Sequence, residues 1–212
     1  MPQLTRGILI AIEGIDGSGK STLAKNLSLS LEQQGFNTTL TKEPGDSQLG
    51  KEIRTLVQTQ NIPISGHAQY LLFAADRAQH LSERIIPALK ENKIILCDRL
   101  ADSSLAYQGY GNGLDLEMIK SVNKWSMQGI PIDLTVFVHV PVEIALERCG
   151  KRGALSPYEK KEFLHKVADG FEELYKNRTD VIIVDGTESP ENLNKQVCSA
   201  IEQWIKNKNL LS

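Results

Sequence analysis

Apolar residues gather in five short runs, separated by longer stretches in which apolar positions recur at helical spacing. The runs are rich in β-branched residues and predict strands over 7–13, 37–42, 93–98, 134–140 and 180–185. The stretches between them predict helices over 20–34, 48–58, 66–90, 115–128, 142–150, 158–176 and 190–207. Gly35 after the first helix and Ser189-Pro190 before the last are ordinary stop and start signals.

The order of these elements predicts an α/β fold. Four of the five runs are almost continuously apolar, as expected where helices cover both faces of a parallel sheet. Alternating strands and helices imply right-handed crossovers and a doubly wound sheet. We expect one domain over residues 1–212, with ligands bound at the carboxyl ends of its strands.

Composition and charge narrow the class of protein. The net charge of −2 disfavours nucleic acid as a main partner, because surfaces that bind polyanions carry a basic excess. Cys97, Cys149 and Cys198 lack metal-ligand spacing and indicate reduced thiols in a cytoplasmic protein. The chain has neither a signal-peptide layout nor an apolar run long enough for a bilayer, so we expect no membrane association.

The first apolar run leads directly into "GIDGSGKS" (14–21), which fits the phosphate-binding pattern G-x-x-x-x-G-K-[ST] of P-loop NTPases. Backbone N–H groups of such a turn face phosphate oxygens, and the following helix adds a favourable dipole. We expect Lys20 to reach the β- and γ-phosphates and Ser21 to ligate Mg²⁺. The other expected ATP-binding residues are Gly14, Gly17, Ser18, Gly19 and Thr22. The motif leaves open whether the terminal phosphate goes to water, to a metabolite or nowhere.

Charged residues also follow the second and third strands. Glu43 in "KEPGDS" (42–47) is expected at the edge of a Pro-Gly turn, although this stretch alone favours an ordinary surface loop. Asp98 ends the third strand, where an acid can support Mg²⁺, and Arg99 can clamp a phosphate. The alternative is a surface pair between Asp98 and Arg99.

The predicted helix around 68–85 carries a second candidate site. Its expected core stripe consists of Leu71, Ala74, Ala78, Leu81 and Ile85. Phe73 and Arg77 lie one turn apart beside that stripe, where a ring and a guanidinium can hold a flat heterocycle by stacking and hydrogen bonding. The alternative for Phe73 is ordinary packing.

Taken together, these blocks resemble thymidylate kinases, which phosphorylate dTMP with ATP. The resemblance spans about residues 7–205. It rests on "IEGIDGSGKST", "TKEPGDSQLGKEIR", "LLFAADRAQH", "DRLADSSLAYQG", "IDLTVFVHV" and "FLHKVADGFEELY". The P-loop is shared by many families, whereas the "LLFAADRAQH" and "DR…SSLAYQG" blocks are specific to this one.

The resemblance implies a five-stranded parallel sheet with helices on both sides and a role for each site residue. Phe73 would stack on thymine, Arg77 would bind a base carbonyl, and Arg99 would hold the dTMP phosphate beside the γ-phosphate. Asp16 would take the sugar 3′-hydroxyl, and Tyr107 would fill the space of a 2′-hydroxyl. The remaining substrate contacts would come from Glu43, Ser103, Ser104 and Gln108.

The resemblance also implies a homodimer and a short lid that closes over ATP. The lid matches the basic stretch 148–161, for which an ordinary solvated surface is the alternative. Its "ALSPYEKK" departs from the Asp-Arg-x-Glu-like element of the family, and Leu100 replaces a Tyr or His. Since Gly17 and Ser18 give the P-loop no arginine, the catalytic arginine would be Arg152. Arg148, beside adenine, and Lys151 are the alternatives.

The expected function is therefore Mg²⁺-dependent, in-line phosphoryl transfer from ATP to dTMP, catalysed by Lys20, Arg99 and Arg152 with Ser21 and Asp98 at the metal. Two other functions stay open. One is a P-loop kinase for deoxynucleosides or another monophosphate. The other is a nucleotide-dependent switch or silent binder, although the chain has no suitably placed N-K-x-D guanine motif.

Overall fold

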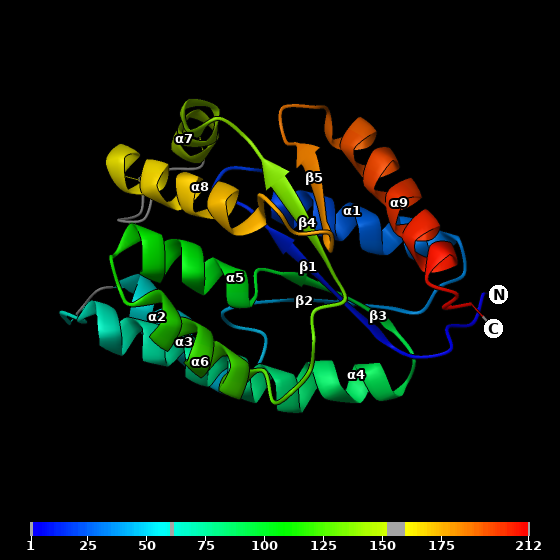
Figure 1. Ribbon diagram of the computed structural model, residues 1–212, viewed down its shortest axis with the longest axis horizontal. Coiled ribbons are helices and arrows are strands. Elements are labelled where there is room, and N and C mark those ends of the chain that lie inside the picture. The colour runs from blue at the N-terminus through cyan, green and yellow to red at the C-terminus, as the bar shows by residue number, and fades with distance from the viewer. Residues whose placement is uncertain (1, 60–61, 152–159, 212) are drawn as a thin grey trace.

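A computed structural model describes residues 2–59, 62–151 and 160–211 (Figure 1). Five strands form one parallel sheet in the order β2-β3-β1-β4-β5. The strands are β1 (Ile8–Glu13), β2 (Thr38–Lys42), β3 (Ile94–Asp98), β4 (Leu134–His139) and β5 (Val181–Asp185). The α/β fold with a parallel five-stranded sheet is thus confirmed, and each strand lies within its predicted range.

Helices cover both faces of the sheet, and alternation along β1 explains why. Ile8, Ile10 and Ile12 join one core cluster with residues of α1 and α9. Leu9 and Ala11 point the other way and join a cluster with residues of the long helix before β3. The helices are α1 (Lys20–Gln33), α2 (Gln48–Thr59), α3 (Gly66–His80), α4 (Ile86–Lys90), α5 (Ala101–Ser104), α6 (Leu116–Ser126), α7 (Val142–Gly150), α8 (Lys161–Tyr175) and α9 (Pro190–Asn207).

The predicted helix over 66–90 exists, but it contains a π-helical segment, η1 (Leu81–Ile85), between α3 and α4. Its predicted core stripe is wrong in one member. Leu71 is 56% exposed, whereas Tyr70 is buried and donates its hydroxyl hydrogen to Ile119 O at 2.9 Å. The buried face therefore starts one residue earlier than the apolar pattern indicated, because a tyrosine supplies its first contact.

A helix that the sequence pattern did not predict follows β3. It comprises α5 and a second π-helical segment, η2 (Leu105–Gly111). Serines and two glycines give this stretch little helix propensity, so its helix depends on packing against α8. At Gly111 an added Cβ would lie 2.7 Å from the Phe163 ring, and at Gly170 it would lie 2.7 Å from Tyr110. Both glycines allow the close approach of the two helices.

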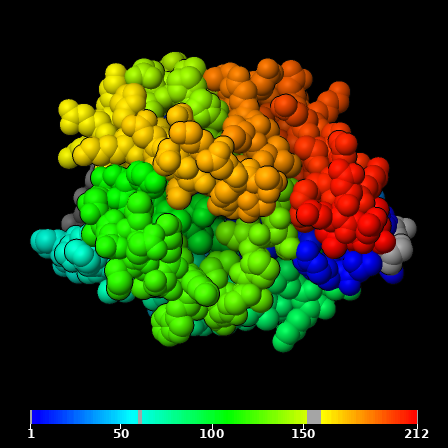
Figure 2. All heavy atoms as spheres, in the orientation of Figure 1, coloured from blue at the N-terminus to red at the C-terminus, as the bar shows by residue number. Residues whose placement is uncertain are grey.

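The two ends of the chain lie side by side at one end of the molecule (Figures 1 and 2). Leu4 and Leu211 form an isolated antiparallel bridge there. Within the described residues, none of the helices combines the length and apolarity that crossing a bilayer requires.

Candidate active site

The P-loop lies between β1 and α1, at the carboxyl end of the central strand. Gly19 caps α1 with a φ of 98°, a left-handed conformation that favours glycine. Lys20 is buried, and its Nζ donates to Ile15 O at 3.1 Å. Burial, followed by repulsion from Arg99, lowers the pKa of Lys20 to about 8. A buried ammonium group in this position favours an anionic ligand that would complete its contacts.

Asp98 and Ser21 come together where the sequence predicted a metal. The Ser21 hydroxyl donates to Asp98 Oδ2, while Asp98 Oδ1 is buried and has no hydrogen-bond partner among the described residues. A buried carboxylate oxygen without a partner is costly unless a cation or donor compensates it. Across the described segments, groups of three or more His, Cys, Asp or Glu suited to a metal are absent. The unpaired Asp98 oxygen and the Ser21 hydroxyl suit Mg²⁺, which takes few protein ligands and completes its shell with phosphate oxygens and water.

Arg99 makes its ion pair with Asp16 of the P-loop and is largely buried, so the expectation of a surface pair between Asp98 and Arg99 is wrong. Its Nη2 lies 2.7 Å from Asp16 Oδ1 and 3.0 Å from the Tyr107 hydroxyl oxygen, and its Nη1 lies 3.1 Å from Ser103 Oγ. The guanidinium also stands 4.7 Å above the centre of the Tyr107 ring. Four contacts thus hold one cation beside the phosphate-binding turn.

Asp16 and Tyr107 keep complementary protonation states in this group. Burial would raise the pKa of Asp16, but Arg99 and Lys20 hold it well below its usual range. Burial raises the pKa of Tyr107, so its hydroxyl stays protonated and donates to Asp16 Oδ2 at 3.0 Å. Asp16 is therefore a carboxylate that can accept further hydrogen bonds.

A pocket of about 170 Å³ opens beside these residues. All nine residues predicted to bind the substrate line it: Asp16, Glu43, Phe73, Arg77, Arg99, Ser103, Ser104, Tyr107 and Gln108. They come from the P-loop, the segment after β2, α3, and the helix after β3. The carboxyl-end rule explains the meeting of the P-loop, the post-β2 segment and the post-β3 residues, while α3 forms the opposite wall.

Six lining residues were not predicted: Pro44, Arg54, Val57, Gln58, Asp76 and Leu100. Arg54, Val57 and Gln58 lie at helical spacing on α2, and Arg54 Nη1 donates to Pro44 O at 3.0 Å. Their spacing indicates a common face, but nothing in the sequence indicates that this face turns toward the pocket. For Asp76, the only signal in the sequence is its position next to Arg77, which was predicted to bind the substrate.

Arg77 is fully buried at the pocket wall and bonded on several sides. Its Nε lies 3.0 Å from Glu43 Oε2, its Nη1 lies 2.7 Å from Asn123 Oδ1, and its Nη2 lies 2.9 Å from Ser104 Oγ. The expectation that Glu43 is displayed at a turn edge, and that its stretch is a surface loop, is wrong. The Glu43 N–H donates to Asp98 O, so the chain continues beside β3 and turns this side chain inward.

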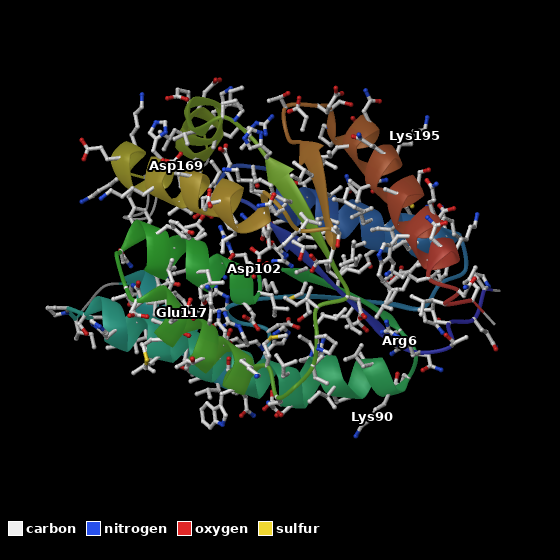
Figure 3. The ribbon with its side chains drawn as sticks, in the orientation of Figure 1. Arg6, Lys90, Asp102, Glu117, Asp169 and Lys195 are labelled. Carbon is white, nitrogen blue, oxygen red and sulfur yellow. The ribbon has the colours of Figure 1, made fainter. Side chains whose placement is uncertain are left out.

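Glu13, the last residue of β1, is a buried acid that the sequence analysis missed. It accepts hydrogen bonds from Leu100 N at 2.8 Å and from Ser103 Oγ at 2.5 Å. Burial, followed by the nearby Asp102, raises the pKa of Glu13 to about 7. Asp102 lies near the middle of the molecule, on α5 (Figure 3), and pairs with Arg178 at 2.7 Å. Glu13 thus fixes the start of α5 and, through Ser103, the position of Arg99.

The predicted lid is described only in part. Arg152 lies outside the described residues. Arg148, near the end of α7, donates from Nη1 to Gly186 O at 2.8 Å. A Cβ at Gly186 would lie 2.9 Å from Ser18 O, so this contact is next to the P-loop. Lys151 is exposed and pairs with Glu147.

Comparison with known proteins identifies the family. The model of the thymidylate kinase family matches residues 12–197. The chain belongs to the thymidylate kinase family. Among curated relatives, the thymidylate kinase of Halothermothrix orenii is 41% identical over 197 residues, covering 91% of this chain and 95% of that protein. The thymidylate kinase of Desulfovibrio desulfuricans is 38% identical over 210 residues, covering 94% and 97%.

A solved structure agrees with this assignment. The crystal structure of thymidylate kinase from Ehrlichia chaffeensis superimposes with a TM-score of 0.74 at 29% sequence identity. The match covers 92% of this chain and 98% of that chain. The likeness therefore extends over the sheet and the helices around the pocket.

Proposed function

We propose that this protein catalyses the ATP-dependent phosphorylation of dTMP to dTDP, for dTTP synthesis, in the cytoplasm. One observation carries the proposal. A single pocket joins the phosphate side, Asp16 and Arg99, to a ring and a guanidinium at Phe73 and Arg77. A nucleoside monophosphate has its phosphate at one end and its base at the other, so it matches this arrangement.

The base and the sugar have separate contacts in this proposal. Phe73 stacks on thymine, and Arg77 hydrogen-bonds a base carbonyl with Ser104 and Gln108 beside it. Tyr107 lies under the deoxyribose, and the Asp16 carboxylate accepts a hydrogen bond from the 3′-hydroxyl. The low pKa of Asp16 supports this role, because only the ionised form is an acceptor on both oxygens.

Phosphoryl transfer then depends on position and charge. Arg99 holds the acceptor phosphate, Lys20 holds the β- and γ-phosphates, and the dTMP oxygen that attacks is already anionic, so no general base is needed. Ser21 and Asp98 hold Mg²⁺, which when bound neutralises charge on the phosphate oxygens. Arg148 contacts the ATP side, and Arg152 is the lid arginine at the transferred phosphoryl.

We also propose that the protein is a homodimer. Three large apolar side chains on the neighbouring helices α3 and α6 are strongly exposed: Leu71 at 56%, Met118 at 62% and Trp125 at 81%. A second copy that covers this face would remove them from water. Sedimentation velocity tests this state directly, and a monomer at micromolar concentration would contradict it.

A coupled ADP-release assay tests the proposed activity. With ATP and Mg²⁺, ADP should form rapidly with dTMP and only slowly with thymidine or with no acceptor. ADP release with thymidine or with another monophosphate, but not with dTMP, would assign the protein to another kinase class. Nucleotide binding by calorimetry without ADP release would indicate a silent binder.

A further inference from the structure

A chain of hydrogen bonds runs behind the pocket wall, from the molecular surface to Arg77. Asp46 Oδ2 lies 2.6 Å from Thr41 Oγ1, which lies 2.6 Å from His80 Nε2. His80 Nδ1 then lies 3.0 Å from Glu43 Oε1, and the other oxygen of Glu43 accepts from Arg77 Nε. His80 is fully buried at the end of α3, and none of the roles assigned above uses it.

The donors and acceptors along this series of hydrogen bonds define the protonation state of the His80 ring. Asp46 is paired with Arg84 at 3.2 Å, and as a carboxylate it can only accept, so the Thr41 hydroxyl hydrogen points to it. The Thr41 oxygen must then accept from His80 Nε2. Glu43 is already the acceptor of Arg77 and must also accept from His80 Nδ1. Both ring nitrogens therefore carry a hydrogen, which makes His80 an imidazolium.

The charges around His80 also favour the imidazolium form. The buried titratable groups of this cluster are Glu43 from the segment after β2, Asp76 and Arg77 from α3, and the thiol of Cys97 from β3, which interacts with Glu43 and Arg77. Burial raises the pKa of that thiol, so it is neutral. Two carboxylates therefore face one guanidinium, and a neutral His80 would leave an uncompensated negative charge in the interior. Burial, followed by Glu43, raises the pKa of Asp76 to about 6, so Asp76 is mostly ionised at neutral pH.

We propose that His80 is a positioning residue, held as an imidazolium, that fixes Glu43 and through it the Arg77 guanidinium at the base end of the pocket. This inference rests on the proposed function only for what Arg77 binds. Glu43 has two oxygens, one held by His80 and one by Arg77. With both occupied, the carboxylate cannot rotate, and the two terminal nitrogens of Arg77 keep their direction toward Asn123 and Ser104.

Nitrogen-15 NMR of the full-length protein without ligand tests the charge. The chain has four histidines, and the spectrum of His80→Gln identifies which signals belong to His80. At pH 7.5 both ring nitrogens of His80 should give the signals of protonated nitrogens. Thr41→Val, which keeps the side-chain volume, should abolish the protonated Nε2 signal. A neutral tautomer of His80 in the wild type, or a spectrum that Thr41→Val leaves unchanged, would overturn the proposal.

Steady-state kinetics test the positioning role with two variants of His80. Asn places an amide donor near Nδ1, within reach of Glu43, whereas Gln places it near Nε2 and leaves Glu43 Oε1 unpaired. His80→Gln should raise KM for dTMP about tenfold, the scale of one lost charge-assisted hydrogen bond. KM for ATP should be unchanged, and His80→Asn should restore KM for dTMP to within about twofold of the wild type. His67→Gln, the same substitution at an exposed site of α3, is the control.

Some outcomes would contradict the positioning role. One is an equal effect of Gln and Asn at position 80, and another is a parallel rise of both KM values, since a merely structural residue would act in these ways. If His80→Gln does not fold, the spectrum of His80→Asn assigns the His80 signals instead, so that Thr41→Val still decides the charge, and the KM of His80→Asn is compared with that of the wild type. If the wild type does not phosphorylate dTMP, the proposed function fails, whereas the NMR result on His80 stands by itself.

Discussion

At the scale of single residues, the buried ammonium group of Lys20 should make ATP binding depend on pH. Its pKa of about 8 results from burial and from Arg99, and a bound triphosphate acts in the opposite direction because a nearby anion favours the ammonium form. ATP binding should therefore take up about one proton at pH 9 and almost none at pH 7, and affinity should fall as pH rises through 8. Calorimetry in buffers of different ionisation enthalpy measures this uptake. Equal uptake at both pH values, or uptake that persists in Lys20→Met, would refute it.

Glu13 should make the folded protein less stable as pH rises, whereas an acid held in a salt bridge has the opposite effect. Its pKa is raised from the ordinary 4.5 to about 7, so the unfolded chain loses this proton at lower pH than the folded chain. The free energy of unfolding should therefore fall as pH rises from 4.5 to 7, by up to about 3 kcal/mol from this group. Urea unfolding at pH 5 and pH 8 measures the fall in the wild type and in Glu13→Gln. The two proteins should differ in that fall, and identical pH profiles would exclude Glu13 as its source.

Substitution of Phe73 tests whether its ring stacks on the base or serves only to pack the protein. It is half-buried on α3 and lines the pocket, so part of its side chain is accessible from the pocket. Phe73→Ala should weaken dTMP binding by roughly 1–3 kcal/mol, the usual range for a base stacked on an aromatic ring. ATP binding to the same variant, measured by calorimetry, is the internal control and should not change. Unchanged dTMP affinity in a folded variant would mean that Phe73 serves packing alone.

At the scale of elements, the strands were predictable and one helix was not. Buried parallel strands have almost continuous apolar sequences, and these define β1, β3 and β4 without knowledge of the fold. The helix after β3 has no comparable signal. Its serines line the pocket, its Gly111 allows close contact with α8, and neither residue type favours a helix. Its position could be inferred only from the neighbours that it meets in space.

The contact between that helix and α8 should be sensitive to one methyl group. A Cβ at Gly170 would lie 2.7 Å from Cβ and the ring of Tyr110, which cannot swing away without moving η2. Gly170→Ala should therefore lower the free energy of unfolding by about 1–3 kcal/mol through overpacking. Gly150→Ala is the matched control, since a Cβ there meets no described atom within 4 Å beyond its own helix backbone, and it should be neutral or slightly stabilising. Equal stability of the two variants in urea unfolding would contradict this account of the interface.

At the scale of the whole molecule, much of the pocket was predictable because topology gathers the ends of parallel strands at one edge. Asp16 and Arg99 follow β1 and β3, which are adjacent, and the two side chains meet at 2.7 Å. The inward turn of Glu43 and the role of Glu13 were not predictable, because each depends on hydrogen bonds between segments far apart in the sequence. The position of Arg54 at the pocket was not predictable either, because it depends on how α2 packs.

Charge on the transferred phosphoryl connects the P-loop with the predicted lid, two segments far apart in the chain. The P-loop supplies Lys20 but no arginine, and Arg99 is committed to the acceptor side by Asp16. We therefore predict that a further cation for the transferred phosphoryl comes from the lid. Arg148 is held at Gly186, beside the P-loop, which suits a ground-state contact with ATP. Arg152 precedes Gly153 in the sequence, and we propose the catalytic role for it.

Arg152→Ala should therefore lower kcat strongly while dTMP affinity stays nearly intact. Arginine fingers contribute about 10³–10⁵ in rate, and a lid with several basic residues should lie at or below the lower end. Arg148→Ala should instead raise KM for ATP, because it removes a contact made before the transition state. Steady-state kinetics of both variants, with Lys151→Ala as a third, measure the split. Loss of kcat in Arg148→Ala or Lys151→Ala with normal kcat in Arg152→Ala would assign the catalytic role to that other residue. Normal kcat in all three would mean that transition-state charge is neutralised by Lys20, Arg99 and the metal alone.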